Sequence, residues 1–148
     1  MNIPFKTINI LMADDDPDDR VLMKEALEEN NLPSILNFVE DGEELMDYLH
    51  MRGRFTRENT IMPGLIFLDL NMPKIDGREA LRLIKSDPQL RRIPVIVLTT
   101  SKSDDDINKT YDLGVNSYIS KPSKFADLVK VTREIGSYWF ATVQLPKV

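Results

Sequence analysis

Five short apolar segments, each followed by a stretch with helical periodicity, constrain the fold of this chain more than any other feature of its sequence. The apolar segments are predicted as strands at 8–13, 35–39, 65–68, 95–98 and 115–119. Strands of this composition are typical of a parallel sheet that helices cover on both faces. The alternation therefore predicts an α/β fold, doubly wound and built from five strand–helix units.

Helix-start signals follow the predicted strands. Pro17 stands at the first position of one helix, where its missing N–H costs nothing. Asp41 and Asp76 are each followed three residues later by a glutamate, which is the spacing of a capping box. These signals place the start of each helix close to the end of a strand.

The last two predicted helices differ in their apolar content. One begins at Ser103 and carries Ile107 and Tyr111 as its apolar residues. The other, over about 123–140, has apolar residues on more than one face: Phe125, Leu128, Val129, Val131, Ile135, Tyr138, Trp139 and Phe140. A helix on a sheet needs only one apolar stripe, so the surplus predicts an exposed partner surface. The alternative is that the tail folds back and hides Trp139.

Length and composition indicate one soluble domain over residues 1–148, with a core at about 7–140 and a C-terminal tail at 141–148. No apolar run approaches the roughly 20 residues that span a bilayer, so no membrane partner is expected. Residues 1–5 do not look like a secretory signal, and the absence of cysteine is compatible with a reducing cytosol. A net charge of −5 argues against a nucleic-acid partner, and we expect a cytoplasmic protein.

Polar residues follow four of the predicted strands at the end where the binding crevice of an open parallel sheet forms. They are Asp14, Asp15 and Asp16 after the first strand, Asp69 after the third, Thr99, Thr100 and Ser101 after the fourth, and Lys121 after the fifth. Four strand ends therefore supply carboxylates, hydroxyls and an amine to one edge of the sheet.

Each of these side-chain types has a use in phosphoryl chemistry. Clustered carboxylates repel one another, and a hard cation such as Mg²⁺ offsets that repulsion. A lysine and a threonine can neutralise and orient a phosphoryl group, and an aspartate oxygen can be its acceptor. The set predicts a phosphoryl-accepting site.

Taken singly, the same residues have ordinary explanations. Asp16, Asp18 and Asp19 are most simply a helix cap and favourable charges in a first helical turn. Asp69 can be a turn residue, and Lys121 a solvated cation. Only their joint placement favours a site.

At this point the motifs resemble those of a known family, the receiver domain of two-component response regulators. The matching segments are 10–16, 68–73 with Asp76-Gly77, 97–101 and 118–122. The resemblance covers nearly the whole chain and implies the flavodoxin-like sheet with strand order 2-1-3-4-5.

The resemblance also implies roles for individual residues. Asp69 is expected to be the phosphoacceptor. It is also expected to bind a Mg²⁺ ion, or alternatively Mn²⁺. The other expected ligands are Asp15, which binds the ion directly, Asp14, which binds it through a water, and the backbone carbonyl of Asn71. The expected phosphoryl-contacting and switch residues are Lys121, Thr99, Thr100 and Tyr118, of which Thr99 moves onto the phosphoryl group and Tyr118 turns inward behind it.

Two segments resemble more narrowly the stand-alone receivers of bacterial and cyanobacterial phytochromes: the long insertion at Met51–Met62 and the aromatic ending at 138–146. This implies a phytochrome-type sensor histidine kinase as phosphoryl donor and a homodimer formed through the last helix and tail, with Tyr138, Trp139 and Phe140 at the partner surface. One departure is that Ala13-Asp14 stands where related sequences often have Val-Glu. From composition alone, the insertion is either an exposed surface loop or a partner contact.

The predicted function is a phosphorylation switch rather than a true enzyme. One alternative is an interaction module that signals without phosphorylation. Another is an aspartate-nucleophile phosphatase, which usually has a second acid two residues after its nucleophile. The chain has Asn71 at that position, which disfavours the phosphatase.

Overall fold

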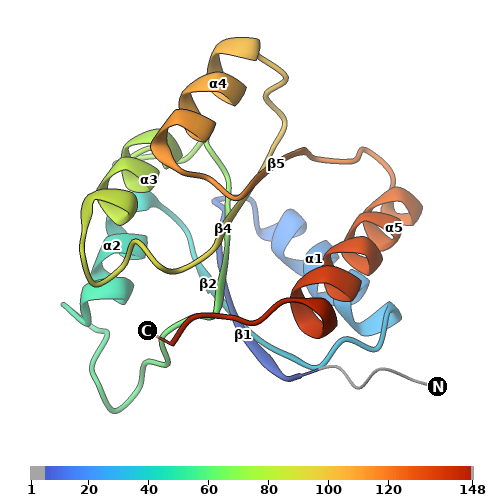
Figure 1. The fold of residues 1–148 in the computed structure, drawn as a ribbon, viewed down its shortest axis with the longest axis horizontal. Helices are drawn as coiled ribbons and strands as arrows, with labels where there is room; N and C mark the ends of the chain where they lie inside the picture. The colour runs from blue at the N-terminus through green and yellow to red at the C-terminus, as the bar shows by residue number, and fades with distance from the viewer. Residues whose placement is uncertain (1–5, 148) are drawn as a thin grey trace.

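The computed structural model describes residues 6–147 and centres on one five-stranded parallel sheet (Figure 1). Its strands are β1 (Ile8–Ala13), β2 (Ser34–Val39), β3 (Leu65–Leu68), β4 (Val95–Thr99) and β5 (Ser117–Ser120). They lie in the order β2-β1-β3-β4-β5 and every neighbouring pair is parallel, which confirms the predicted flavodoxin-like order. Residues 1–5, where no secretory signal is expected, and Val148, the last residue of the predicted tail, lie outside the described residues.

The fifth strand begins at Ser117, two residues later than predicted. The N–H of Val115 donates to a carbonyl of the preceding helix, α4 (Asp104–Leu113), at 3.0 Å. Asn116 then bridges to β4, because its N–H donates to the Val95 carbonyl at 3.0 Å and its side-chain oxygen accepts from the Val95 N–H at 2.9 Å. These two residues therefore form a helix end and a side-chain bridge instead of the start of the strand.

Helices cover both faces of the sheet. They are α1 (Pro17–Glu29), α2 (Gly42–His50), α3 (Gly77–Ser86), α4 and α5 (Phe125–Ile135), and a π-helical segment, η1 (Gly136–Thr142), continues α5. Within β1, Ile10 and Met12 pack with α1 and α5, whereas Leu11 and Ala13 pack with α2 and α3. Burial on both faces explains why the strands are almost continuously apolar. Within residues 6–147, no helix is both long enough and apolar enough to cross a membrane.

Side-chain caps begin four of the helices, as the sequence predicts. The side chains of Asp16, Asp41, Asp76 and Ser103 each accept a hydrogen bond from a backbone N–H two or three residues further on. Each bond satisfies a donor that would otherwise lack a partner in the first helical turn. The caps fix where each helix leaves the sheet edge at which the strands end.

The last helix is shorter than predicted, and Phe140 is not exposed. After Ile135 the chain changes to the wider turns of η1, which alters the residues that face the sheet. Phe140 is 1% exposed and packs in the layer beneath α1 and α5, so its predicted place in a partner surface is wrong. Tyr138 remains 53% exposed, and Trp139 is half-buried. Trp139 is not fully covered, and the tail runs on to the start of β3, where Leu145 lies beside Gly64.

The predicted insertion at Met51–Met62 lies on the surface and is anchored to α2. The Tyr48 hydroxyl donates to the Ile61 carbonyl at 2.8 Å, and the Tyr48 ring lies 5.1 Å from the ring of Phe55. Arg54 in the loop pairs with Glu44 of α2 at 2.7 Å. The loop is therefore held at both its beginning and its end, and a role in partner contact stays a prediction.

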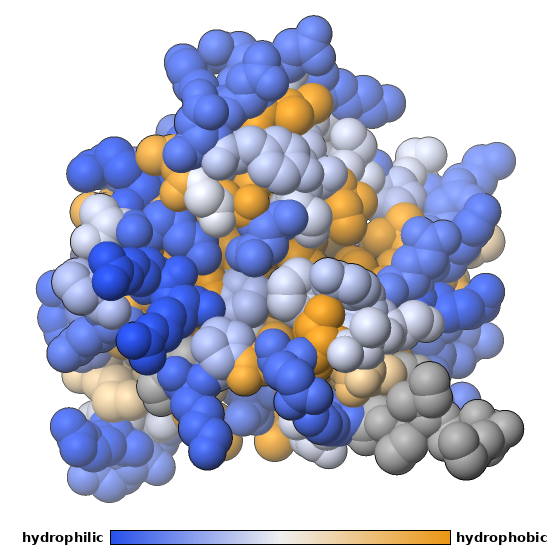
Figure 2. Space-filling view, viewed as in Figure 1, coloured by the Kyte–Doolittle hydropathy of each residue, from blue (hydrophilic) through white to orange (hydrophobic). Residues whose placement is uncertain are grey.

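Helix α4 is attached to the rest of the protein by a polar contact and by one apolar residue at its end, Leu113, which packs against the layer of α2 and α3. Its predicted apolar residues do not enter the core: Ile107 is half-buried and Tyr111 is 50% exposed. Its buried residues are instead Asp106 and Thr110. Figure 2 shows mostly hydrophilic residues over the outer surface of α4, at the top of the view.

An ion pair between α3 and α4 forms this polar attachment. Arg78 Nε and Nη2 donate to the two carboxylate oxygens of Asp106 at 2.6 and 2.7 Å, and the Ser101 hydroxyl donates to Asp106 at 2.6 Å. The hydrogen bonds from Arg78 and then Ser101 lower the pKa of Asp106 from 3.8 to about 2. A bidentate arginine–carboxylate pair of this kind is both strong and directional.

We expect the Arg78–Asp106 pair to make stability pH-dependent in acid. Because the folded-state pKa of Asp106 is depressed, its contribution is complete above about pH 4 and is lost as the pH falls towards about 2. Since Arg78 is partly exposed to solvent, we expect a contribution of about 1–2 kcal/mol. Urea unfolding of wild type and Asp106→Asn should therefore differ at neutral pH and converge in acid. The exposed neighbour variant Asp105→Asn is the control, and a pH-independent difference would contradict the assignment.

A second prediction concerns Gly77, at the start of α3. A Cβ atom there would overlap the backbone carbonyl of Asp69, whereas a Cβ at Gly64 would come no closer than 3.4 Å to its neighbours. We expect Gly77→Ala to lower the free energy of unfolding by about 2 kcal/mol or more, despite the better helix propensity of alanine. Thermal unfolding of Gly77→Ala and the control Gly64→Ala tests this, and equal transition temperatures would contradict it.

Candidate functional site

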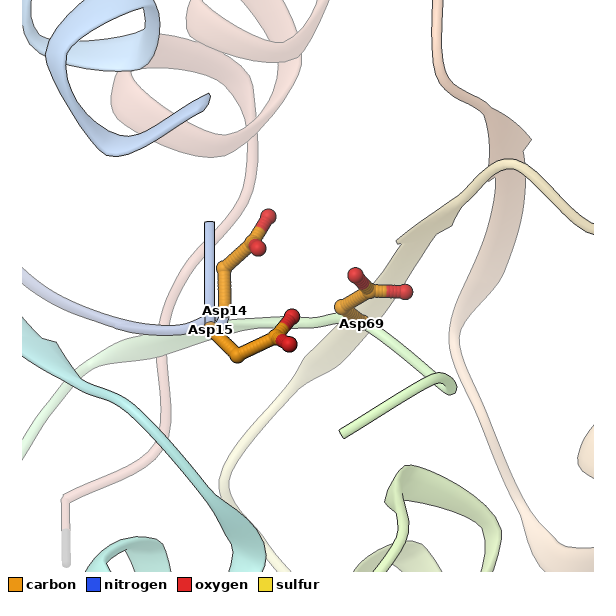
Figure 3. A group of neighbouring side chains, drawn as sticks. All are labelled: Asp14, Asp15 and Asp69. Atoms are coloured by element: carbon orange, nitrogen blue, oxygen red, sulfur yellow. The ribbon is translucent and has the colours of Figure 1, made fainter. Parts of the chain in front are cut away.

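Three carboxylates meet where β1 and β3 end. β1 and β3 pair in a register that places Ala13 opposite Leu68, so the next residues, Asp14 and Asp69, lie side by side. The Asp69 N–H donates to the Ala13 carbonyl at 3.0 Å and continues the ladder. One oxygen each of Asp14, Asp15 and Asp69 lies within 4.8 Å of the others, and Figure 3 shows the three side chains next to one another, with Asp15 extending towards Asp69.

The environment of these carboxylates is partly buried. Asp14 is 1% exposed and Asp69 is 6% exposed, whereas Asp15 faces solvent. Burial raises the pKa of Asp14, and the hydrogen bond from Lys121 acts in the opposite direction. Three carboxylate oxygens at this separation form a donor set that suits a hard divalent cation such as Mg²⁺ or Mn²⁺, which would offset their repulsion. The expected Asn71 lies next to them, and its N–H donates to Asp69 Oδ1 at 3.2 Å.

Lys121 is the cation of the site. Its Nζ contacts one oxygen of each of three carboxylates: Asp14 at 2.8 Å, Asp69 at 3.0 Å and Asp19 at 2.6 Å. The side chain is 12% exposed. Burial opposes its charge, but the hydrogen bonds to Asp14 and Asp19 outweigh burial and hold the pKa of Lys121 above its usual range. Lys121 is therefore a fixed positive charge beside Asp69.

The predicted hydroxyl and aromatic residues lie on β4 and β5. Thr99 is fully buried at the end of β4, and the Ser101 N–H approaches its hydroxyl at 3.5 Å. Thr100 is exposed one residue further on. The half-buried Tyr118 packs against the layer formed with α2 and α3, and its hydroxyl donates to the Ser101 carbonyl at 2.9 Å. Tyr118 and Thr99 therefore both form contacts with Ser101, in the loop after β4.

Two contacts of this region are absent from the sequence-based prediction. The sequence predicts Asp19 only as a favourable charge in the first turn of α1, but its carboxylate is a direct partner of Lys121. A signal was available, since α1 begins at the edge where β1 ends and side chains in a first turn lean back towards the helix start. The sequence predicts Ser101 only as a hydroxyl after the fourth strand, whereas in the structure it joins Tyr118 to Asp106.

The arrangement can accept and stabilise a phosphoryl group. Asp69 offers a carboxylate oxygen, Lys121 supplies a positive charge, and Thr99 supplies a hydroxyl at the next strand end. The neighbouring carboxylates can hold the cation that such a group needs.

Comparison with known proteins agrees with this geometry. A family model described as the response regulator receiver domain matches residues 10–133. The response regulator Rcp1 of a Synechocystis strain is 44% identical over 137 residues, which is 93% of this chain and 92% of Rcp1.

Two solved structures are also similar. The Mn²⁺-bound form of Rcp1 has a TM-score of 0.86 at 43% identity and covers 95% of this chain and 99% of its own. The phosphorylated cyanobacterial phytochrome response regulator RcpA has a TM-score of 0.88 at 44% identity, with 96% and 100% covered. Together with the strand order, these matches show that the chain belongs to the response regulator receiver family.

Proposed function

We propose that this chain is a phosphorylation switch in which Asp69 accepts a phosphoryl group from a sensor histidine kinase. The observation that carries the proposal is the placement of the buried Asp69 carboxylate, with Lys121 Nζ at 3.0 Å and two further carboxylates close by. Rcp1 and RcpA, whose solved structures are described as Mn²⁺-bound and phosphorylated, support it. The similarity to RcpA also supports a phytochrome-type kinase as donor.

In the proposed reaction, an Asp69 oxygen attacks the phosphorus atom of a kinase phosphohistidine. The P–O bond forms and the P–N bond breaks, the electron pair of the P–N bond goes to the imidazole nitrogen, and the ring takes up a proton from solvent to leave as neutral imidazole. Lys121 stabilises the negative charge of the phosphoryl oxygens. Asp14, Asp15, Asp69 and the Asn71 carbonyl would hold a divalent cation, which when bound neutralises further negative charge on the phosphoryl group.

The switch residues transmit the change in charge. On phosphorylation, the Thr99 hydroxyl moves to contact the phosphoryl group, and Thr100 lies next to it in the sequence. Tyr118 then turns inward behind Thr99. Tyr118 and Thr99 both contact Ser101, so movement of the β4–α4 loop would alter the surroundings of both side chains. The new negative charge on Asp69 thereby shifts the surface that runs from β4 to α5 from one packing arrangement to another.

The acceptor assignment is tested with phosphoramidate, a small phosphoryl donor with a P–N bond like that of phosphohistidine. We expect Asp69→Asn to abolish phosphoryl uptake in the presence of Mg²⁺, because the amide lacks the nucleophilic oxygen charge. Intact-protein mass spectrometry measures the uptake, and circular dichroism checks the fold. Asp112→Asn, an exposed change on α4, is the control. Uptake by Asp69→Asn at the wild-type rate would exclude Asp69 as acceptor.

The second copy of the chain is the partner that we propose for the end of α5 and η1. Ile119, Val131, Ile135, Tyr138 and Trp139 contribute to a groove of about 320 Å³ on this face. The Tyr138 and Trp139 rings pack edge to face with their centroids 5.3 Å apart. The groove adjoins β5, which is the edge strand of the sheet. Two copies of the chain can therefore pack against each other through this groove and edge.

We expect Trp139→Ala to weaken self-association by about tenfold or more, as is typical when a central interface aromatic residue is truncated. Sedimentation equilibrium measures the dimer dissociation constant. The control is Tyr111→Ala, which removes an exposed aromatic side chain from α4 that does not line this groove. An unchanged dissociation constant in Trp139→Ala, or an equal loss in the control, would contradict the proposed dimer surface.

A further inference from the structure

We infer that Asp19 is a positioning residue for Lys121 and sets how much of the lysine's charge acts on Asp69. This inference rests on the proposed phosphoryl-accepting function. The lysine ammonium has three N–H donors, and three carboxylates occupy them. The distance to Asp19 is 2.6 Å, shorter than the distances to Asp14 and Asp69.

Asp19 differs from the other two partners of Lys121 because it has no place in the predicted metal site. Asp14 and Asp69 belong to the carboxylate cluster that suits a divalent cation, and Asp19 is not part of that cluster. Within the described residues, the ion pair with Lys121 is the only salt bridge of Asp19. Asp19 can therefore hold Lys121 while Asp14 and Asp69 serve other ligands.

The position of the pair favours a substantial interaction. The Asp19 side chain is 30% exposed and that of Lys121 is 12% exposed. Both border a small cavity of about 40 Å³, whose other walls are apolar side chains of α1, α5 and the sheet, among them Met23 and Leu128. Apolar surroundings lower the local dielectric constant and strengthen the attraction between the two charges.

The consequence is a competition for Lys121. A phosphoryl group on Asp69 needs a donor from Lys121, and Asp19 draws that ammonium towards α1. Without the Asp19 charge, one N–H donor is released and the positive charge acts fully on the space between Asp14 and Asp69. An anion should then bind more tightly at Asp69, and a cation should bind less tightly at the carboxylate cluster. A merely structural defect would weaken both.

The test is isothermal titration of Mg²⁺, and of beryllofluoride at saturating Mg²⁺, as a stable mimic of the phosphoryl group. For Asp19→Asn we expect the beryllofluoride dissociation constant to fall about threefold to tenfold and that of Mg²⁺ to rise about threefold. Asp18→Asn removes the same charge from the same helical turn without a lysine contact, and at physiological salt its exposed position should leave both constants nearly unchanged. Asp19→Glu keeps the charge and should remain close to wild type.

A double-mutant cycle shows whether the effect passes through Lys121. In the Lys121→Gln background, Asp19→Asn should change either constant no more than Asp18→Asn does. An effect that persists undiminished in that background overturns the inference, and so does weaker binding of both ligands by a folded Asp19→Asn protein. Circular dichroism establishes that each variant is folded. Wild-type protein that binds neither Mg²⁺ nor beryllofluoride overturns the proposed function, and the role of Asp19 falls with it.

Discussion

The parallel pairing of β1 with β3 is the constraint on which the rest of the site depends. It aligns Ala13 with Leu68, so the backbone forces two carboxylates together at the same edge of the sheet. A shift of one residue would turn every side chain of a strand to the opposite face and separate this pair. The repulsion between Asp14 and Asp69 is partly offset by the positive charge of Lys121. This residue directly follows β5, which is separated from β3 by β4 in the sheet.

The parts that sequence predicts are those governed by local signals. Strand order, helix caps and the residues at the strand ends follow from short-range patterns and from family motifs. The unpredicted parts depend on geometry between distant segments. Asp19 and Lys121 are separated by 102 positions in the sequence. Phe140 turns inward because the helix widens after Ile135, a change that its apolar pattern does not reveal.

The helices are joined to the sheet by different kinds of interaction. α1 and α5 contribute apolar residues to one layer, and α2 and α3 to the other. α4 contributes the carboxylate of Asp106, which pairs with Arg78 on α3, and one apolar residue at its end, Leu113, which packs against the layer of α2 and α3. Apolar contacts are non-directional, whereas this ion pair is directional and partly exposed. The protein therefore combines a firmly packed sheet with one helix whose attachment depends largely on a directional ion pair, with a single apolar residue, Leu113, added at its end.

Both described ends of the chain lie where the strands begin, on the side of the sheet away from Asp69 (Figure 1). The Lys6 N–H donates to the Phe140 carbonyl at 3.0 Å just before β1, and Leu145 packs beside Gly64 just before β3. A strand of this length spans roughly 20 Å. The two described ends, Lys6 and Lys147, consequently lie about one strand length from the acceptor carboxylate, on the side of the sheet opposite the crevice that a kinase would approach.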